Sequence, residues 1–179
     1  TDAHGFVEAL RREAQFDARG KKVVLIGAGG AARAAAFGLT REDVSSLVIA
    51  NRTLARAEAL AAELRDSVDS VTEVAALDLA SSMLAERIAS ADLIVNATSV
   101  GMQGGPAEGR SPVAKGLIQP ACVVHDMVYS PEATPLLRMA EDAGARVVCG
   151  LPMLVHQGAA AFERWTGTDA PIDVMYSAA

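Results

Sequence analysis

One short segment constrains the fold of this chain most: the apolar run Val23 to Ile26, followed directly by Gly27-Ala28-Gly29-Gly30-Ala31-Ala32. The second run has the form G-x-G-x-x-A at a junction between a strand and a helix. In such a junction Gly27 allows a tight turn, Gly29 lets the backbone approach a pyrophosphate, and Ala32 lets the helix pack closely on the strand. The first amide groups of the helix then point at the anion. The segment therefore predicts a dinucleotide site.

The end of the next predicted strand indicates which dinucleotide would bind. Residues 47–50 are apolar, and the polar set Asn51, Arg52, Thr53 and Arg56 follows them about two dozen residues after the glycines. Where this fold binds NAD, an Asp or Glu in this region accepts the ribose hydroxyls and would repel a 2′-phosphate. Two guanidinium groups and a hydroxyl suit a phosphate instead, since each charge-assisted hydrogen bond contributes roughly 1.5–3 kcal/mol. Either run alone is common in flexible turns and solvated strand ends, but together they predict NADP rather than NAD.

The alternation of apolar and helical patterns predicts the architecture. Strands are expected at residues 23–26, 47–50, 71–76, 93–96, 122–127 and 146–149. Helices are expected at residues 5–16, 31–39, 54–65, 80–89 and 134–143, with a last one that contains Pro152 in its first turn and runs to Trp165. This order predicts an α/β protein with a Rossmann-like, doubly wound, mainly parallel sheet and helices on both faces. A long loop over residues 100–120 would lie beside the ligand-binding edge of the sheet.

Composition and charge exclude several classes of function. The 179 residues are 51% hydrophobic but only 4% aromatic, which is typical of one α/β domain with an aliphatic core. The net charge of −6, without an extended basic stripe, argues against a nucleic-acid partner. No apolar run approaches the roughly 18 residues of a membrane span, and no secretory signal opens the chain. We therefore expect a cytoplasmic protein with no membrane partner.

The remaining candidate ligands are better explained by structure. Cys122 and Cys149 lie in apolar runs and are expected to be buried free thiols. For His4, His125 and His156 we favour structural or solvated roles. No His, Cys or carboxylate groups show the spacing of metal ligands, so no metal site is predicted. In the last helix an apolar stripe is expected to include Val155, Ala159, Phe162 and Trp165.

Several motifs together resemble the shikimate dehydrogenase family, which includes quinate/shikimate dehydrogenases, and the resemblance covers nearly the whole chain. Besides the glycine run and Asn51-Arg52-Thr53-x-x-Arg56, they occur in the family's order as Thr1-Asp2-x-x-Gly5, Asn96-Ala97-Thr98-Ser99-x-Gly101-Met102, Asp126-Met127-Val128-Tyr129-x-Pro131 with Thr134-Pro135-Leu136, and Gly150-x-x-Met153-Leu154-x-x-Gln157. The resemblance implies an NADP-dependent oxidoreductase that interconverts 3-dehydroshikimate and shikimate in aromatic amino-acid biosynthesis.

The resemblance also implies a division of the chain. Residues 1–20 would be a helix that links to an amino-terminal substrate domain outside this chain. Residues 21–150 would form the NADP-binding domain, and residues 151–179 a helical segment that returns to the substrate domain. The oligomeric state is left open, with a homodimer among the alternatives.

By the same resemblance, each motif carries a role. Asp2 would be catalytic and would hydrogen-bond a substrate hydroxyl, and Tyr129 and Gln157 would bind further substrate hydroxyls. Thr98 and Ser99 would line the cofactor path. Met127, Gly150 and Met153 would flank the nicotinamide. Outside the family context these residues are equally typical of caps, turns and core.

The lysine that shares proton transfer with the aspartate in this family belongs to the substrate domain. Lys21, Lys22 and Lys115, the lysines of this chain, stand in no matching context. We therefore expect the chain alone to be inactive. Two alternatives to a shikimate dehydrogenase remain, namely a quinate/shikimate dehydrogenase and a non-catalytic NADP-binding module.

Overall fold

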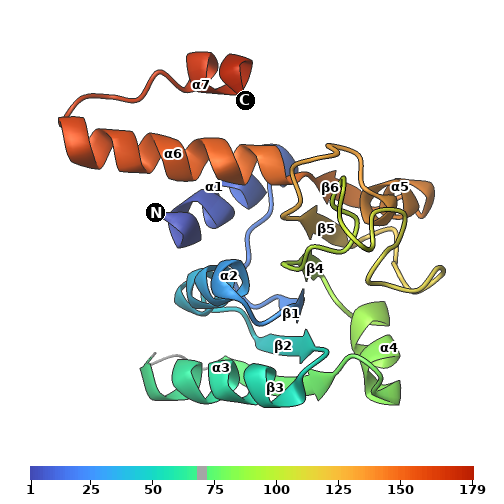
Figure 1. Ribbon diagram of the computed structural model, residues 1–179. Helices are drawn as coiled ribbons and strands as arrows, with labels where there is room; N and C mark the ends of the chain where they lie inside the picture. The colour runs from blue at the N-terminus through green and yellow to red at the C-terminus, as the bar shows by residue number, and fades with distance from the viewer. Residues whose placement is uncertain (68–71) are drawn as a thin grey trace.

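The computed structural model describes residues 1–67 and 72–179 and contains a six-stranded parallel sheet in the order β3-β2-β1-β4-β5-β6 (Figure 1). The strands are β1 (Lys22–Ile26), β2 (Ser46–Asn51), β3 (Glu73–Asp78), β4 (Leu93–Asn96), β5 (Val123–Asp126) and β6 (Arg146–Val148). All neighbouring pairs run parallel. The strand order reverses between β1 and β4, which is the point where sheets of this kind bind ligands.

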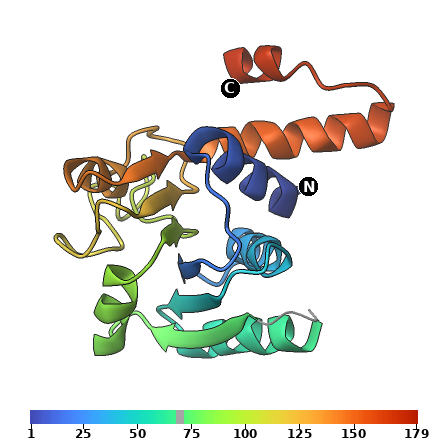
Figure 2. The same ribbon diagram turned by 180° about the vertical axis from the view of Figure 1, so that it is seen from behind.

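Helices cover both faces of this sheet (Figures 1 and 2). They are α1 (Asp2–Ala14), α2 (Gly30–Arg41), α3 (Leu54–Ser67), α4 (Ser82–Ala89), α5 (Pro135–Asp142), α6 (Gly150–Thr166) and α7 (Ile172–Ala178). Residues of α1, α2, α3 and α6 share one hydrophobic core, and residues of α4 and α5 share the other. The prediction of a doubly wound, parallel α/β fold is confirmed.

Alternating side chains of the strands build these two cores. In β1, Val23 and Leu25 join the core under α1 and α2, whereas Val24 and Ile26 join the opposite core. The strand is buried on both faces, so it reads in the sequence as a continuous apolar run rather than as an alternating one.

Helix α1 lies between α6 and α2, and small residues allow the close approach (Figure 1). A Cβ atom added at Gly5 would lie 2.7 Å from the backbone nitrogen of Gln157 and 2.8 Å from the carbonyl oxygen of Met153. Gly38 of α2 faces α1 in the same way, with 3.2 Å from an added Cβ to Val7. The backbones of the three helices can therefore pack with few intervening side chains.

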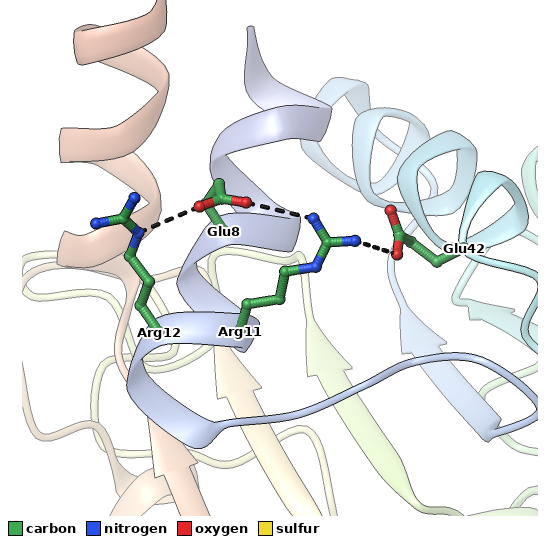
Figure 3. Close-up of polar contacts among 4 residues, drawn as sticks. All are labelled: Glu8, Arg11, Arg12 and Glu42. Carbon is green, nitrogen blue, oxygen red and sulfur yellow. Dashed lines mark hydrogen bonds and ion pairs between the residues drawn. The ribbon is translucent and has the colours of Figure 1, made fainter.

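Exposed ion pairs lie along α1 and connect it to the end of α2 (Figure 3). Glu8 accepts from Arg11 at 3.3 Å and from Arg12 at 3.1 Å, and Arg11 also reaches Glu42 at the end of α2 over 2.5 Å. Because such pairs are exposed to solvent, each contributes about 0–1 kcal/mol, so the apolar contacts of α1 dominate its docking.

Several predicted boundaries and environments need correction. The first helix covers 2–14 rather than 5–16, because Gln15 adopts a left-handed backbone conformation (φ 48°) that ends it. The strand expected at 71–76 is found at 73–78, and residue 71 lies outside the described residues. Cys149 is half-buried at the start of α6, not buried within a strand.

The carboxyl-terminal segment differs most from expectation. Helix α7 was not predicted as a separate element, and it lies along the side of α6 that faces away from the sheet (Figures 1 and 2). The hydroxyl of Tyr176 meets Nε2 of His156 at 3.4 Å, which connects the two helices. Trp165 of the expected apolar stripe is 84% exposed, and it lines a groove between α6 and α7 together with Val155 and Phe162.

Candidate functional site: the carboxyl edge of the sheet

The predicted site residues lie in the loops that follow the strands, at the starts of α1, α2 and α3, and in the first half of α6. They form two groups on either side of the switch point. One group surrounds the glycine loop after β1 and the turn after β2. The other surrounds the loops after β4 and β5 and the beginning of α6.

The three glycines of the loop after β1 differ in what surrounds them. Gly27 has a φ of 117°, and an added Cβ would lie 2.7 Å from the carbonyl oxygen of Ala97, so the turn requires glycine. A Cβ atom added at Gly29 or Gly30, in contrast, would meet no atom within 4 Å. Gly29 is the N-cap of α2 and supplies no side-chain acceptor, so the first amides of this helix are available to an anion.

A cleft of about 410 Å³ extends from this loop to α3. It is lined by Ala28, Gly29, Gly30, Arg33, Arg56, Ala59, Leu60 and Glu63. Arg33 spans from α2 to α3 by pairing with Glu63, and its guanidinium lies 5.2 Å from the centre of the Phe37 ring. The charge of Arg33 is thus already paired, whereas Arg56 is a second cation on the same cleft.

The turn after β2 presents two arginines without an acidic partner. The side-chain amide of Asn51 donates to the carbonyl oxygen of Thr53 at 2.9 Å and so shapes the turn. Arg52 and Arg56 are exposed, and neither forms an ion pair within residues 1–67 and 72–179. Exposed, unpaired guanidinium groups next to a backbone anion site can form bidentate hydrogen bonds with a phosphate.

A buried polar network joins the ends of β4 and β5. Asn96 donates from Nδ2 to Oδ1 of Asp126 at 2.9 Å, and its own Oδ1 accepts from the Thr98 hydroxyl at 2.7 Å. Asp126 also accepts from the Thr134 hydroxyl at 2.7 Å and from the backbone N–H of Val128 at 3.0 Å. Burial raises the pKa of the Asp126 carboxyl, and the bonds from Thr134, Val128 and Asn96 oppose that rise. Asn96 and Asp126 stand in the sequence motifs, but no pattern in the sequence predicts a role for either.

The start of α6 rests directly on the loop after β5. The backbone N–H of Gly150 donates to the carbonyl oxygen of Val128 at 3.2 Å, and an added Cβ would lie 2.4 Å from the carbonyl oxygen of Met127. Met127 is half-buried and Met153 is buried, with 7% of its surface exposed. The structure therefore packs Gly150 directly against Met127, with Met153 one turn further along α6.

The predicted substrate residues are more open to solvent. Tyr129 is 55% exposed, and Gln157 is half-buried on α6. Asp2 is exposed in the first turn of α1, whose Gly5 contacts the backbone of Gln157. In the other loop, Thr98 is half-buried and Ser99 is exposed. These polar groups thus come from four separate segments, namely α1, the loop after β4, the loop after β5 and α6.

Other reactive groups lie apart from this edge. Cys122 is a buried free thiol whose pKa burial raises to about 11, so it stays protonated at neutral pH. Within the described ranges, no cluster of three or more His, Cys, Asp or Glu side chains is arranged to hold a metal ion. Of the described helices, none combines the length and the apolar character that crossing a membrane requires.

Comparison with known proteins assigns the chain to a family. Residues 8–103 match the family model for shikimate / quinate 5-dehydrogenase, and residues 150–179 match that for the shikimate 5′-dehydrogenase C-terminal domain. A relative from Methanopyrus kandleri, shikimate dehydrogenase (NADP(+)), is 48% identical over 179 residues, which are 99% of this chain and 60% of the relative. One from Desulforamulus reducens, with the same name, is 42% identical over 98% of this chain and 59% of its own length. The chain thus spans about 60% of the length of these relatives.

Solved structures show the same relationship. Shikimate 5-dehydrogenase from Listeria monocytogenes, in complex with shikimate and NAD, superposes with a TM-score of 0.89 at 35% identity, over 99% of this chain and 61% of that one. Quinate dehydrogenase from Corynebacterium glutamicum, in complex with NAD, gives 0.89 at 32% identity, over 99% and 60%. The enzyme from Thermus thermophilus, in complex with NADP(H) and shikimate, gives 0.81 at 37% identity, over 99% and 60%. On the family-model match over more than half of its residues, the chain belongs to the shikimate / quinate 5-dehydrogenase family.

Proposed function

We propose that this chain is the NADP-binding part of an oxidoreductase that interconverts 3-dehydroshikimate and shikimate. The observation that carries the cofactor assignment is the pair Arg52 and Arg56, which are exposed and free of ion pairs among the described residues. Arg56 lines the glycine-loop cleft, and Arg52 lies in the turn after β2. The relatives from Methanopyrus kandleri and Desulforamulus reducens, both named shikimate dehydrogenase (NADP(+)), support it.

The glycine loop and the two arginines divide the phosphates of the cofactor between them. The pyrophosphate would lie on the open backbone of Gly29 and Gly30, against the first amides of α2. The 2′-phosphate would be bound by Arg52 and Arg56, with the hydroxyl of Thr53 as a further donor. NAD lacks this phosphate, so it would forgo those charge-assisted bonds.

The opposite side of the edge would position the reacting ends. Met127, Gly150 and Met153 would border the nicotinamide, and Thr98 and Ser99 the path to it. The bound cofactor would supply a hydride to the ring carbonyl carbon of the substrate, and the carbonyl oxygen would take up a proton. Tyr129, Gln157 and Asp2 would hold the substrate hydroxyls in the orientation that this transfer requires.

Proton transfer would need a group from outside this chain. In our proposal Asp2 orients a lysine of a preceding substrate domain, residues 1–20 link to that domain, and residues 151–179 pack against it. Residues 21–150 then act as the cofactor domain, located in the cytoplasm. We expect this chain alone to bind cofactor without turning over shikimate.

Quinate oxidation is a second candidate, favoured by the TM-score of 0.89 to a quinate dehydrogenase in complex with NAD. Fold similarity does not separate the two substrates, because a shikimate enzyme gives the same score. The arginine pair favours NADP and therefore the shikimate reaction. An enzyme that joins this chain to its substrate domain, assayed with both acids and both cofactors, separates the candidates.

Replacing Arg52 tests the cofactor assignment. Arg52→Ala should weaken NADP⁺ binding by about 1.5–3 kcal/mol in titration calorimetry, because it removes one charge-assisted phosphate contact. Binding of NAD⁺ should stay unchanged. Arg138→Ala, which removes an exposed arginine of α5, serves as the charge-matched control and should alter neither. Parallel losses for both cofactors with Arg52→Ala would contradict the assignment.

A further inference from the structure

Asp126 is a buried carboxylate that has no role among the proposed cofactor and substrate contacts. Its side chain is completely buried at the end of β5, and it accepts hydrogen bonds from Asn96, Val128 and Thr134. These three donors belong to three different segments, namely the end of β4, the loop after β5 and the cap of α5. A carboxylate is costly to bury, so a fully bonded one at this place indicates a specific structural demand.

The partners of Asp126 hold two loops against each other. Through Asn96 the carboxylate is connected to Thr98, whose hydroxyl donates to Asn96 at 2.7 Å and accepts from the backbone N–H of Val100 at 3.2 Å. Through Val128 it fixes the turn after Met127. Two loops that leave neighbouring strands are therefore joined through one buried side chain.

The network extends to two helices. The Thr134 hydroxyl donates to Asp126 at 2.7 Å and accepts from the N–H of Leu137 at 3.3 Å, so it also caps α5. The carbonyl oxygen of Val128, in turn, accepts from Gly150 at the start of α6. Displacement of the carboxylate would release contacts to all of these segments at once.

The glycine-loop cleft lies outside this network. Neither Asp126 nor its hydrogen-bond partners Asn96, Val128 and Thr134 line the cleft that Arg56 borders. The loop after β4 touches the glycine loop at Gly27, but Gly29, Gly30 and Arg56 line a cleft that no member of the network borders. A change at Asp126 should therefore disturb the loops after β4 and β5 more than the phosphate-binding cleft.

We propose that Asp126 is a positioning residue, which sets the spacing between the Thr98 loop and the Met127–Tyr129 loop and thereby aligns the nicotinamide half of the cofactor. Asp126 acts through Asn96, Val128 and Thr134 and touches neither cofactor nor substrate. The inference rests on the proposed function, since it assumes that a dinucleotide spans both sides of the edge.

The test compares a whole cofactor with its adenosine half. NADP⁺ reaches both sides of the edge, whereas adenosine 2′,5′-bisphosphate carries the 2′-phosphate but no nicotinamide. Asp126→Asn keeps one acceptor oxygen but places an amide N–H where the second carboxylate oxygen stood, so at least one of the three bonds is lost or reversed. We expect this variant to bind NADP⁺ about tenfold more weakly and the bisphosphate within about twofold of the original chain.

A conservative pair at Thr134 provides the matched control. Thr134→Val removes the hydroxyl at nearly constant volume, whereas Thr134→Ser keeps it. The valine variant should show the selective loss for NADP⁺, and the serine variant should restore binding. Circular dichroism of each variant checks that the chain is folded.

The outcomes separate this inference from the one on which it rests. An equal loss of NADP⁺ and bisphosphate binding, or no loss of either in Asp126→Asn, would overturn the positioning role while leaving the cofactor assignment intact. An original chain that binds neither ligand would overturn the proposed function itself, and the positioning role with it.

Discussion

The two sides of the switch point differ in the exposure and the hydrogen bonding of their polar side chains. On the side of β1 and β2, two arginines are exposed without ion pairs in the described ranges, and two glycines face open space. On the side of β4 and β5, Asn96, Asp126 and Thr134 are buried and bonded to one another. On the first side the polar groups have partners to gain from a ligand. On the second side the polar groups already bond to one another.

This difference predicts how each side responds to substitution. Replacing an exposed, unpaired arginine should change binding and leave the free energy of unfolding nearly unchanged. Replacing a buried or tightly packed residue near β5 should mainly lower that free energy.

The tight contact at the start of α6 should show the largest effect. In Gly150→Ala the new Cβ would lie 2.4 Å from the carbonyl oxygen of Met127, so the backbone must shift. We expect the free energy of unfolding, measured with urea, to fall by about 3 kcal/mol. Gly158→Ala in the same helix meets no atom within 4 Å and should be neutral or stabilising by up to about 1 kcal/mol. Equal effects of the two variants would contradict the described packing.

Acid should destabilise the buried side through His125. This residue is completely buried and packs edge-on against Phe6 at 5.3 Å, and neither ring nitrogen has a hydrogen-bond partner within the described part of the chain. Burial lowers the pKa of His125 to about 3, whereas the unfolded chain takes up this proton near pH 6.5. Stability attributable to His125 is therefore complete above pH 6.5 and falls toward pH 3, by about 2 kcal/mol at pH 5.

Urea unfolding at pH 7 and pH 5 measures this contribution. His125→Leu should remove it, so that the variant loses about 2 kcal/mol less than the original chain between the two values. Asp126, whose raised pKa gives a contribution of opposite sign, is present in both proteins and cancels in the difference. Identical pH dependence in both would show that His125 is not held neutral by burial.

The smallest effect is expected on the open side, at the ion pair across the cleft. Glu63 places a carboxylate beside the proposed phosphate site and pairs with Arg33, whose side chain is 55% exposed. Glu63→Gln should change the free energy of unfolding by less than about 1 kcal/mol, because exposed pairs contribute little. It should tighten NADP⁺ binding a few-fold at low salt, with the gain lost as salt screens the charges. Weaker binding would indicate that the pair holds the cleft open.

Local patterns were enough to predict most of the fold. The apolar run before Gly27 and the arginines after Asn51 predicted β1, β2 and the turn between sheet and helix, because each feature lies within a few residues. The loop over 100–120 was also predicted correctly, since no described helix or strand lies between Asn96 and Val123. The parallel order follows from the alternation of strands and helices.

What the sequence could not predict depends on distant partners. Asp126 receives a bond from Asn96, thirty residues earlier, and no local pattern reveals that pairing. His125 packs against Phe6 of α1, which lies far away in the sequence, near the start of the chain. Trp165 fits the periodicity of the apolar stripe, and the sequence does not reveal that it stays exposed near the end of α6.

The central claim is that the open side of the edge selects the 2′-phosphate of NADP. Titration calorimetry of the unmodified chain with NADP⁺ and NAD⁺ under identical buffer and salt tests it most directly. Two charge-assisted contacts predict that NADP⁺ binds at least about tenfold more tightly. Equal affinities, or tighter binding of NAD⁺, would contradict the claim.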